Sequence, residues 1–124
     1  MQKTMLQAKL HRVKVTHAAL DYEGSCGIDE DLLQASGIVP NQFIDIYNVS
    51  NGERFSTYAI PAPRRSGEIS LNGAAARLAA VGDLLIICAY SSYEAADLQA
   101  YSPVVVLVDE HNRVRAVRGA PELV

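Results

Sequence analysis

Apolar and polar residues alternate along much of this chain, and a period of two is typical of β-strands that are buried on one face. Leu6, Ala8 and Leu10 alternate with polar neighbours, and so do Val13 and Val15. The strands that the pattern predicts lie at residues 3–17, 43–49, 54–60, 68–71, 84–90, 104–108 and 114–117. Asn51-Gly52 stands between two of them, and this pair predicts a tight hairpin turn. The sequence therefore predicts a mainly β protein.

Helical signals are few and short. Asp29-Glu30-Asp31 can cap and begin a helix whose buried side carries Leu32 and Leu33, and Gly37 can end it. A second short helix is expected over residues 74–80, and a helical turn within 91–101. These segments are too few for a doubly wound parallel sheet, so a small β-barrel is the expected architecture.

Composition limits the classes of protein to consider. The chain has 124 residues, of which 49% are hydrophobic and 20% charged, which suits one globular domain spanning 1–124. A net charge of −3 and a pI near 5.5 argue against nucleic acid as a partner. No apolar run approaches the ~20 residues of a membrane helix, and no signal-peptide core follows Met1. A cytoplasmic protein without a membrane partner is expected.

The cysteines and histidines give no metal-ligand pattern. Cys26 and Cys88 are the only thiols, which fits a reducing compartment. Cys26 is a possible nucleophile but is expected to be passive. His11, His17 and His111 lack the spacing of a zinc site. No metal is therefore expected.

The stretch Tyr22-Glu23-Gly24-Ser25-Cys26-Gly27 offers the most distinctive chemistry. Glycine lacks a Cβ, so the Gly24 carbonyl can be approached closely and can adopt unusual backbone geometry. The Ser25 hydroxyl can attack that carbonyl, and elimination from the resulting ester followed by hydrolysis would leave a pyruvoyl group and ammonia. Most Gly-Ser pairs are ordinary turns, so the other residues must decide between these interpretations.

Further candidates lie on the segment after the hairpin and before the second helix. Arg54 could hold a carboxylate bidentately, although a surface arginine beside a turn is also consistent with the sequence. Thr57 and Tyr58 are adjacent and would face opposite sides of a regular strand, as ordinary strand residues do. Asn72-Gly73-Ala74-Ala75 could bind an anion through backbone N–H groups or could simply begin a helix.

Several stretches together resemble the aspartate 1-decarboxylase family, which makes β-alanine for pantothenate. They are Thr4 to Ala18, Tyr22 to Cys26, Ile44 to Ile60, Asn72 to Ala76 and Val81-Gly82-Asp83, in the family's order. The resemblance covers about residues 4–90, which makes it much more specific than a single motif.

The resemblance implies a double-psi β-barrel, a homotetramer and self-cleavage between Gly24 and Ser25 into chains 1–24 and 25–124. Ser25 would become a covalent pyruvoyl cofactor that forms a Schiff base with L-aspartate. Thr57 would assist the ester-forming step and Tyr58 would donate a proton.

The remaining expected roles concern the substrate. The residues expected to contact it are Thr57, Asn72, Gly73, Ala74 and Ala75. Because aspartate has a second carboxylate, we also expect Lys9 and Arg54 to select it. His11, Tyr22 and Glu23 are expected near the site without an assigned role.

Since one strand could not bring all these groups together, the site is expected at a subunit interface. A pyruvoyl decarboxylase for another acidic amino acid, or a non-catalytic double-psi barrel that acts as a binding module, remain the alternatives. Whether cleavage is spontaneous or needs a maturation partner is left open by the sequence.

Overall fold

The computed structural model describes residues 1–119, so the last five residues of the expected domain 1–124 lie outside the described part. Within it, nine strands form one sheet, accompanied by one α-helix and two 3₁₀ helices. The elements are β1 (Gln2–Lys14), β2 (His17–Ala19), β3 (Ser25–Asp29), α1 (Glu30–Ser36), β4 (Phe43–Asn48), β5 (Arg54–Ala62), β6 (Ile69–Asn72), η1 (Gly73–Arg77), β7 (Leu84–Glu94), η2 (Ala95–Ala100), β8 (Val104–Val108) and β9 (Val114–Arg118).

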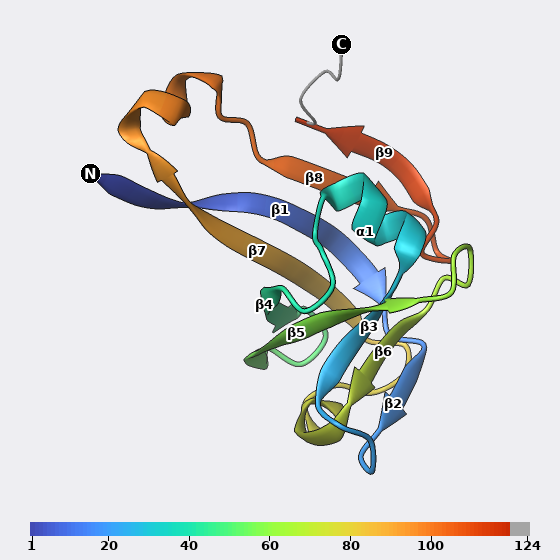
Figure 1. Ribbon diagram of the computed structural model, residues 1–124. Coiled ribbons are helices and arrows are strands. Elements are labelled where there is room, and N and C mark those ends of the chain that lie inside the picture. Colours follow the sequence, from blue (N-terminus) through green and yellow to red (C-terminus); the bar gives the residue numbers. More distant parts are fainter. Residues whose placement is uncertain (120–124) are drawn as a thin grey trace.

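The sheet is mixed and strongly curled (Figure 1). Its order is β2-β6-β3-β5-β4-β7-β1-β8-β9, with parallel pairs β1–β8, β2–β6 and β3–β5 among antiparallel ones. The Thr16 N–H donates to the Ile69 carbonyl at 2.8 Å, which joins the segment between β1 and β2 to the start of β6. This curled, mainly β architecture with few short helices is that of a double-psi β-barrel, and the expected fold class is confirmed.

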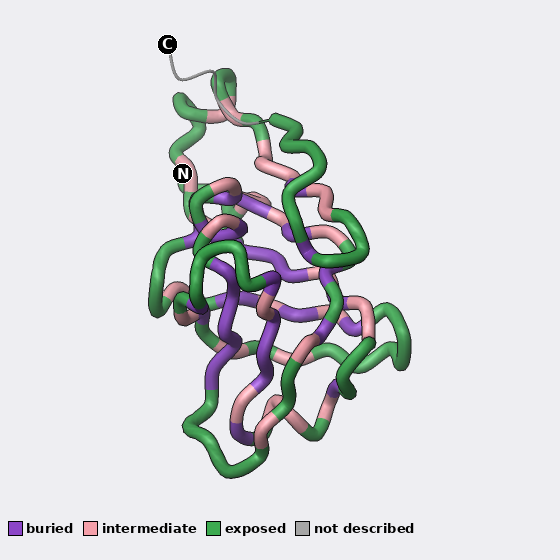
Figure 2. The backbone as a smooth tube through the Cα atoms, turned by 90° about the vertical axis from the view of Figure 1, so that its right-hand side faces the viewer, coloured by how far each residue is buried: buried purple, intermediate pink, exposed green. Residues whose placement is uncertain are grey.

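The core is built by the alternation that the sequence shows. On β4, Ile44 and Ile46 are fully buried while Asp45 and Tyr47 are only partly covered. Figure 2 shows where residues 1–119 are buried, mainly in the interior strands, and where they are exposed, mainly in the connecting loops. Each fully buried isoleucine or leucine contributes about 1.5–3 kcal/mol relative to an exposed one. The inner faces of the strands therefore hold the barrel together, and the outer faces are left for polar chemistry.

The helix α1 begins where the sequence predicts. The buried Asp29 carboxylate accepts from the backbone N–H groups of Asp31 at 2.8 Å, Arg65 at 3.1 Å and Gly67 at 2.9 Å. It therefore caps α1 and also fixes the loop before β6. Gly37, with φ +80°, ends the helix as expected.

Two elements differ from the sequence prediction. The helix expected over residues 74–80 is a shorter 3₁₀ helix, Gly73–Arg77. β7 runs to Glu94 instead of ending near Tyr90, because Gln2–Met5 of β1 pair with the polar residues 91–94 outside the core. Figure 1 shows this β1–β7 ribbon extending away from the barrel toward η2.

β3 was not foreseen by the pattern of alternation. It is a buried strand of five residues, parallel to β5 and antiparallel to β6. Its first residue is Ser25, so the serine of the Gly-Ser pair lies at the start of an interior strand and not in a surface turn.

Candidate active site

Ser25 and Asn72 face each other at one end of the β3–β6 ladder. They are direct partners in the register of the two strands, and the Asn72 side-chain N–H donates to Ser25 Oγ at 3.0 Å. Ser25 is only 3% exposed. A buried hydroxyl with a fixed donor has a restricted orientation, so Asn72 determines how the Ser25 oxygen is held.

The loop before Ser25 packs closely on the backbone of Gly73. Gly73 has φ +68°, and a Cβ built there would lie 2.9 Å from Gly24 Cα and 3.0 Å from both Gly24 N and the Tyr22 carbonyl oxygen. A Cβ at Gly24, in contrast, would meet nothing within 4 Å. Gly73 is therefore required for the close approach, whereas the position that a side chain at Gly24 would take is open.

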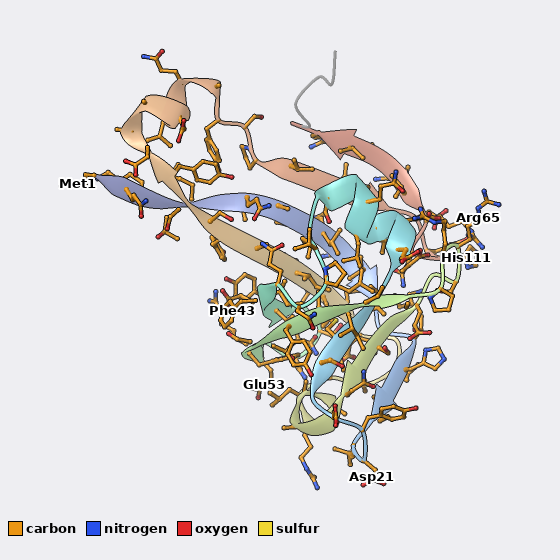
Figure 3. The ribbon with its side chains drawn as sticks, viewed as in Figure 1. Met1, Asp21, Phe43, Glu53, Arg65 and His111 are labelled. Atoms are coloured by element: carbon orange, nitrogen blue, oxygen red, sulfur yellow. The ribbon has the colours of Figure 1, made fainter. Side chains whose placement is uncertain are left out.

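A cavity of about 610 Å³ opens beside Ser25. Tyr58, 38% exposed, lines it from β5, and Tyr22 and Glu23 line it from the loop. The structure thus brings together Ser25, Tyr58 and Asn72 as expected, with Tyr22 and Glu23 as neighbours. Figure 3 marks the tip of this loop at Asp21.

The same cavity has walls that the sequence reasoning did not single out: His17, Glu68 and Ser70. A Cβ at Gly27 would collide with Ser70 Oγ and lie 3.2 Å from Glu68 Oε2, so the missing side chain of Gly27 makes room for both groups. The spacing of Glu68, Ser70 and Asn72 could have indicated that the first two lie near Asn72, since alternate residues of an extended segment share a face.

Thr57 and the start of η1 lie apart from this cavity within one chain. Thr57 pairs with Ile44 and lines a separate, shallow depression with Asn41, Phe43, Ser56 and Tyr58. Gly73, Ala74 and Ala75 follow Asn72 directly, but the cavity lining in the described chain ends at Asn72. Tyr58 borders both hollows and is the link between them.

The two expected cations lie on the outer face of the sheet. Lys9 on β1 pairs with Cys88 on β7, which pairs with Asp45 on β4. Arg54 begins β5 directly opposite Tyr47, and its guanidinium carbon lies 4.2 Å from the centre of the Tyr47 ring. The two cations share this face but do not line the Ser25 cavity.

The cations act on the buried thiol between them. Burial is the main cause that raises the pKa of Cys88, and Asp45 adds to this effect. A hydrogen bond with Tyr90 and the charges of Lys9 and Arg54 oppose it.

Burial also shifts the pKa values of Cys26 and His11. Complete burial raises the pKa of Cys26 to about 12, so its thiol stays protonated. Burial, followed by the charges of Lys9, Arg12 and Arg118, lowers the pKa of His11. The Nδ1 atom of His11 has no hydrogen-bond partner within residues 1–119.

The described residues contain neither a cluster of metal-binding side chains nor a helix suited to a membrane. In residues 1–119, no three or more histidine, cysteine, aspartate or glutamate side chains are placed to hold one metal ion. No helix in the same range has both the length and the apolar character required to cross a bilayer.

Comparison with known proteins agrees with the resemblance. The sequence profile of the aspartate decarboxylase family matches residues 1–115. A protein of Methylobacillus flagellatus named aspartate 1-decarboxylase is 63% identical over 118 residues, which are 95% of this chain and 94% of the relative. A protein of the same name from Bordetella pertussis is 62% identical over 121 residues, which are 98% of this chain and 99% of the relative. Another from Ralstonia pickettii is 60% identical over 118 residues, which are 95% of this chain and 98% of the relative. The name denotes a carboxy-lyase, and the chain belongs to the aspartate decarboxylase family.

Proposed function

We propose that this protein decarboxylates L-aspartate to β-alanine and CO₂ for pantothenate synthesis, by means of a pyruvoyl group made from Ser25. The observation that carries the proposal is the buried Ser25 hydroxyl, which Asn72 holds next to Gly24 in a cavity shared with Tyr58. The names of the relatives support aspartate as the substrate.

The first step of the proposal is cleavage of the chain between Gly24 and Ser25. Ser25 Oγ loses its proton and bonds to the Gly24 carbonyl carbon, while the Gly24–Ser25 C–N bond breaks and the Ser25 nitrogen gains a proton. Removal of the Ser25 α-proton then breaks the Cβ–O bond and releases the Gly24 carboxylate. One water converts the remaining dehydroalanine to a ketone and ammonia, leaving chains 1–24 and 25–124.

The residues around Ser25 fit this product. The cavity of about 610 Å³ is lined by residue 25, so a ketone formed there would face open space. A pyruvoyl group supplies an electrophilic carbonyl that binds the substrate amine and withdraws electrons as CO₂ leaves. No metal is needed for this chemistry, and the electron sink comes from the chain itself.

Tyr58 is the proposed proton donor. Its side chain borders the cavity and is partly open to it, so its phenol can reach a substrate held at residue 25. A general acid must lie within hydrogen-bond reach of the atom that it protonates. Thr57 is proposed to assist cleavage, and the backbone of Gly73, Ala74 and Ala75, together with Asn72, to contact the substrate.

Lys9 and Arg54 are the proposed partners of the substrate carboxylates. Arg54 and Tyr58 are four residues apart on β5, which is about 13 Å along a strand. Aspartate spans only about 5 Å from its amine to its side-chain carboxylate. The separation of the two residues along the strand is therefore larger than the substrate, which supports a site completed by a second chain.

A second copy of the chain would complete the site, and we propose a homotetramer with the site between subunits. Exposed aromatic side chains on the same outer surface support this assembly. Phe43 is 65% exposed, and Tyr58 and Tyr90 are 38% and 40% exposed. Figure 3 labels Phe43 at the start of β4 and Glu53 in the turn before β5.

Intact mass of the denatured protein tests the proposal. We expect two fragments, residues 1–24 and a longer chain that begins with a ketone and lacks a free amino terminus. A parallel assay with aspartate and glutamate then identifies the substrate. If the chain stays whole after warming and after exposure to host extract, and decarboxylates neither amino acid, the proposal is wrong and a binding barrel is the better interpretation.

A further inference from the structure

The outer face of the sheet holds Arg54 in a defined place although its side chain is exposed. Arg54 follows the Asn51-Gly52 turn, where a long cationic side chain would ordinarily sample many rotamers. Its guanidinium carbon instead lies over the ring of Tyr47, 4.2 Å from the ring centre. Cation–π contact of this kind restricts where the charge can go.

Tyr47 is itself fixed from a different strand. Its hydroxyl oxygen lies 3.0 Å from that of Tyr90 on β7. The backbones of β4 and β7 are paired at Tyr47 and Ile86, so the two tyrosines project from adjacent strands on the same face. This hydrogen bond, with burial, raises the pKa of Tyr90, so its phenol remains protonated at neutral pH.

We propose that Tyr47 and Tyr90 are positioning residues that place the Arg54 guanidinium for a substrate carboxylate. The inference rests on the proposed function, because it takes Arg54 as a carboxylate ligand. Tyr90 forms a hydrogen bond with Tyr47, and the ring of Tyr47 contacts the guanidinium of Arg54. Neither tyrosine needs to touch the substrate.

The two contacts also explain why a tyrosine is suited to position 47. A tyrosine gives both an aromatic face for Arg54 and a hydroxyl for Tyr90, whereas phenylalanine gives only the face and leucine gives neither. These substitutions therefore separate the two contacts. An Arg54 side chain that Tyr47 already holds in place loses little conformational freedom when it binds a carboxylate. Loss of the Tyr47–Arg54 contact should therefore weaken substrate binding and have less effect on the rate of the chemical step.

The first test measures binding without the reaction. In a Ser25→Ala background, which cannot form the pyruvoyl group, succinate is titrated by calorimetry as a dicarboxylate that lacks an amine. We expect Tyr47→Leu to weaken succinate binding about two- to fivefold, the size of one exposed cation–π contact. Tyr47→Phe, which keeps the ring, should recover most of the affinity. Equal affinity in all three proteins would overturn the inference.

The second test uses the mature enzyme. Tyr47→Leu should raise KM for aspartate with little change in kcat, the pattern of lost ground-state binding. Tyr47→Phe and Tyr90→Phe should have small effects that do not add in the double variant, because both remove the same hydrogen bond. A fall in kcat or thermal stability with KM unchanged would mean a merely structural pair.

Arg54→Ala distinguishes failure of this inference from failure of the proposed function. If Arg54→Ala raises KM but Tyr47→Leu does not, Arg54 binds substrate without help from Tyr47, and only the positioning role is wrong. If Arg54→Ala leaves both succinate binding and KM unchanged, Arg54 is not a carboxylate ligand, and both proposals on this residue fall together.

Discussion

Single glycines define how close the backbone segments around Ser25 can come. Gly73 and Gly82 both have positive φ, +68° and +95°, but only Gly73 has backbone atoms where its Cβ would be. The left-handed conformation alone costs an alanine roughly 1–2 kcal/mol. The contact with residues 22–24 is an additional requirement that applies to Gly73 and not to Gly82.

This difference gives a matched pair of variants. Gly73→Ala should block or strongly slow cleavage, because the loop that carries Gly24 must shift by several tenths of an ångström or more. Gly82→Ala, with the same type of backbone strain and open space, should be cut normally with a small loss of stability. Intact mass over time and thermal unfolding measure both, and equal cleavage of the two proteins would contradict the role given to Gly73.

The hydrogen bond from Asn72 to Ser25 is the second prediction at this scale. Asn72→Ala removes the donor that orients the hydroxyl, at a cost of about 1 kcal/mol, so cleavage should slow about fivefold. Asn51→Ala removes an exposed side-chain amide bond to the Leu78 carbonyl and serves as the control. Cleavage of Asn72→Ala at the wild-type rate would show that the hydroxyl is oriented by other groups.

At the scale of elements, the Asp29 carboxylate connects α1 to the loop before β6. Asp29→Ala would leave three buried or partly buried N–H groups without their acceptor, and we expect a loss of about 2–3 kcal/mol in the free energy of unfolding. Asp31→Asn is the control, since Asp31 is held mainly in a partly exposed ion pair with Arg64. Urea denaturation compares the two, and similar losses would contradict the bracing role of Asp29.

The turn before β7 gives a prediction on pH. Hydrogen bonds from the Ala80 N–H and then the Asn48 side chain lower the pKa of Asp83 below its usual value near 3.8. A carboxyl whose pKa is lower in the folded state stabilises the fold above the unfolded pKa, and this contribution is lost as pH falls through the folded pKa. Asp83→Asn should therefore be less stable than wild type at pH 7, with the difference shrinking below about pH 4. A difference that does not change with pH would contradict this assignment.

Elements could be predicted from the sequence where burial on one face produces alternation. β4 and β5 and the hairpin between them follow this rule, and α1 follows from its cap and its glycine. β3 could not be found, because a strand buried on both faces and made of small residues shows no alternation. The end of β7 was missed for the opposite reason, since neither of its faces packs against the core there.

The candidate site likewise contains residues that could be predicted from the sequence and residues that could not. Ser25, Tyr58 and Asn72 could be chosen by their chemistry and resemblance, and the structure places them around one cavity. The separation of Lys9 and Arg54 from that cavity could not be deduced, because it depends on which strands become neighbours in the sheet. Glu68 was overlooked because its place in the cavity depends on the missing side chain at Gly27.

At the scale of the whole molecule, a site shared between subunits predicts complementation. Ser25→Ala and Arg54→Ala should each be inactive or weakly active alone. Co-expressed, they can form mixed oligomers in which one copy supplies residue 25 and its neighbour supplies Arg54, and random assortment restores about one quarter of the sites. Decarboxylation of aspartate by the mixed oligomers measures this, and no recovery in verified mixtures would place the complete site within one chain.

The position of β1 has a consequence for the order of events. β1 lies between β7 and β8 in the interior of the sheet, and it belongs to the piece that the proposed cut would detach from the rest of the chain. While the chain is whole, the tether keeps β1 close to its slot at a high effective concentration; after the cut, a β1 that had left would have to return as a separate molecule. The position of β1 in the sheet therefore implies that the chain folds first and is cut second. Once the mature protein is unfolded, its two pieces would have to associate as separate molecules. The original folding of a single chain could not be repeated.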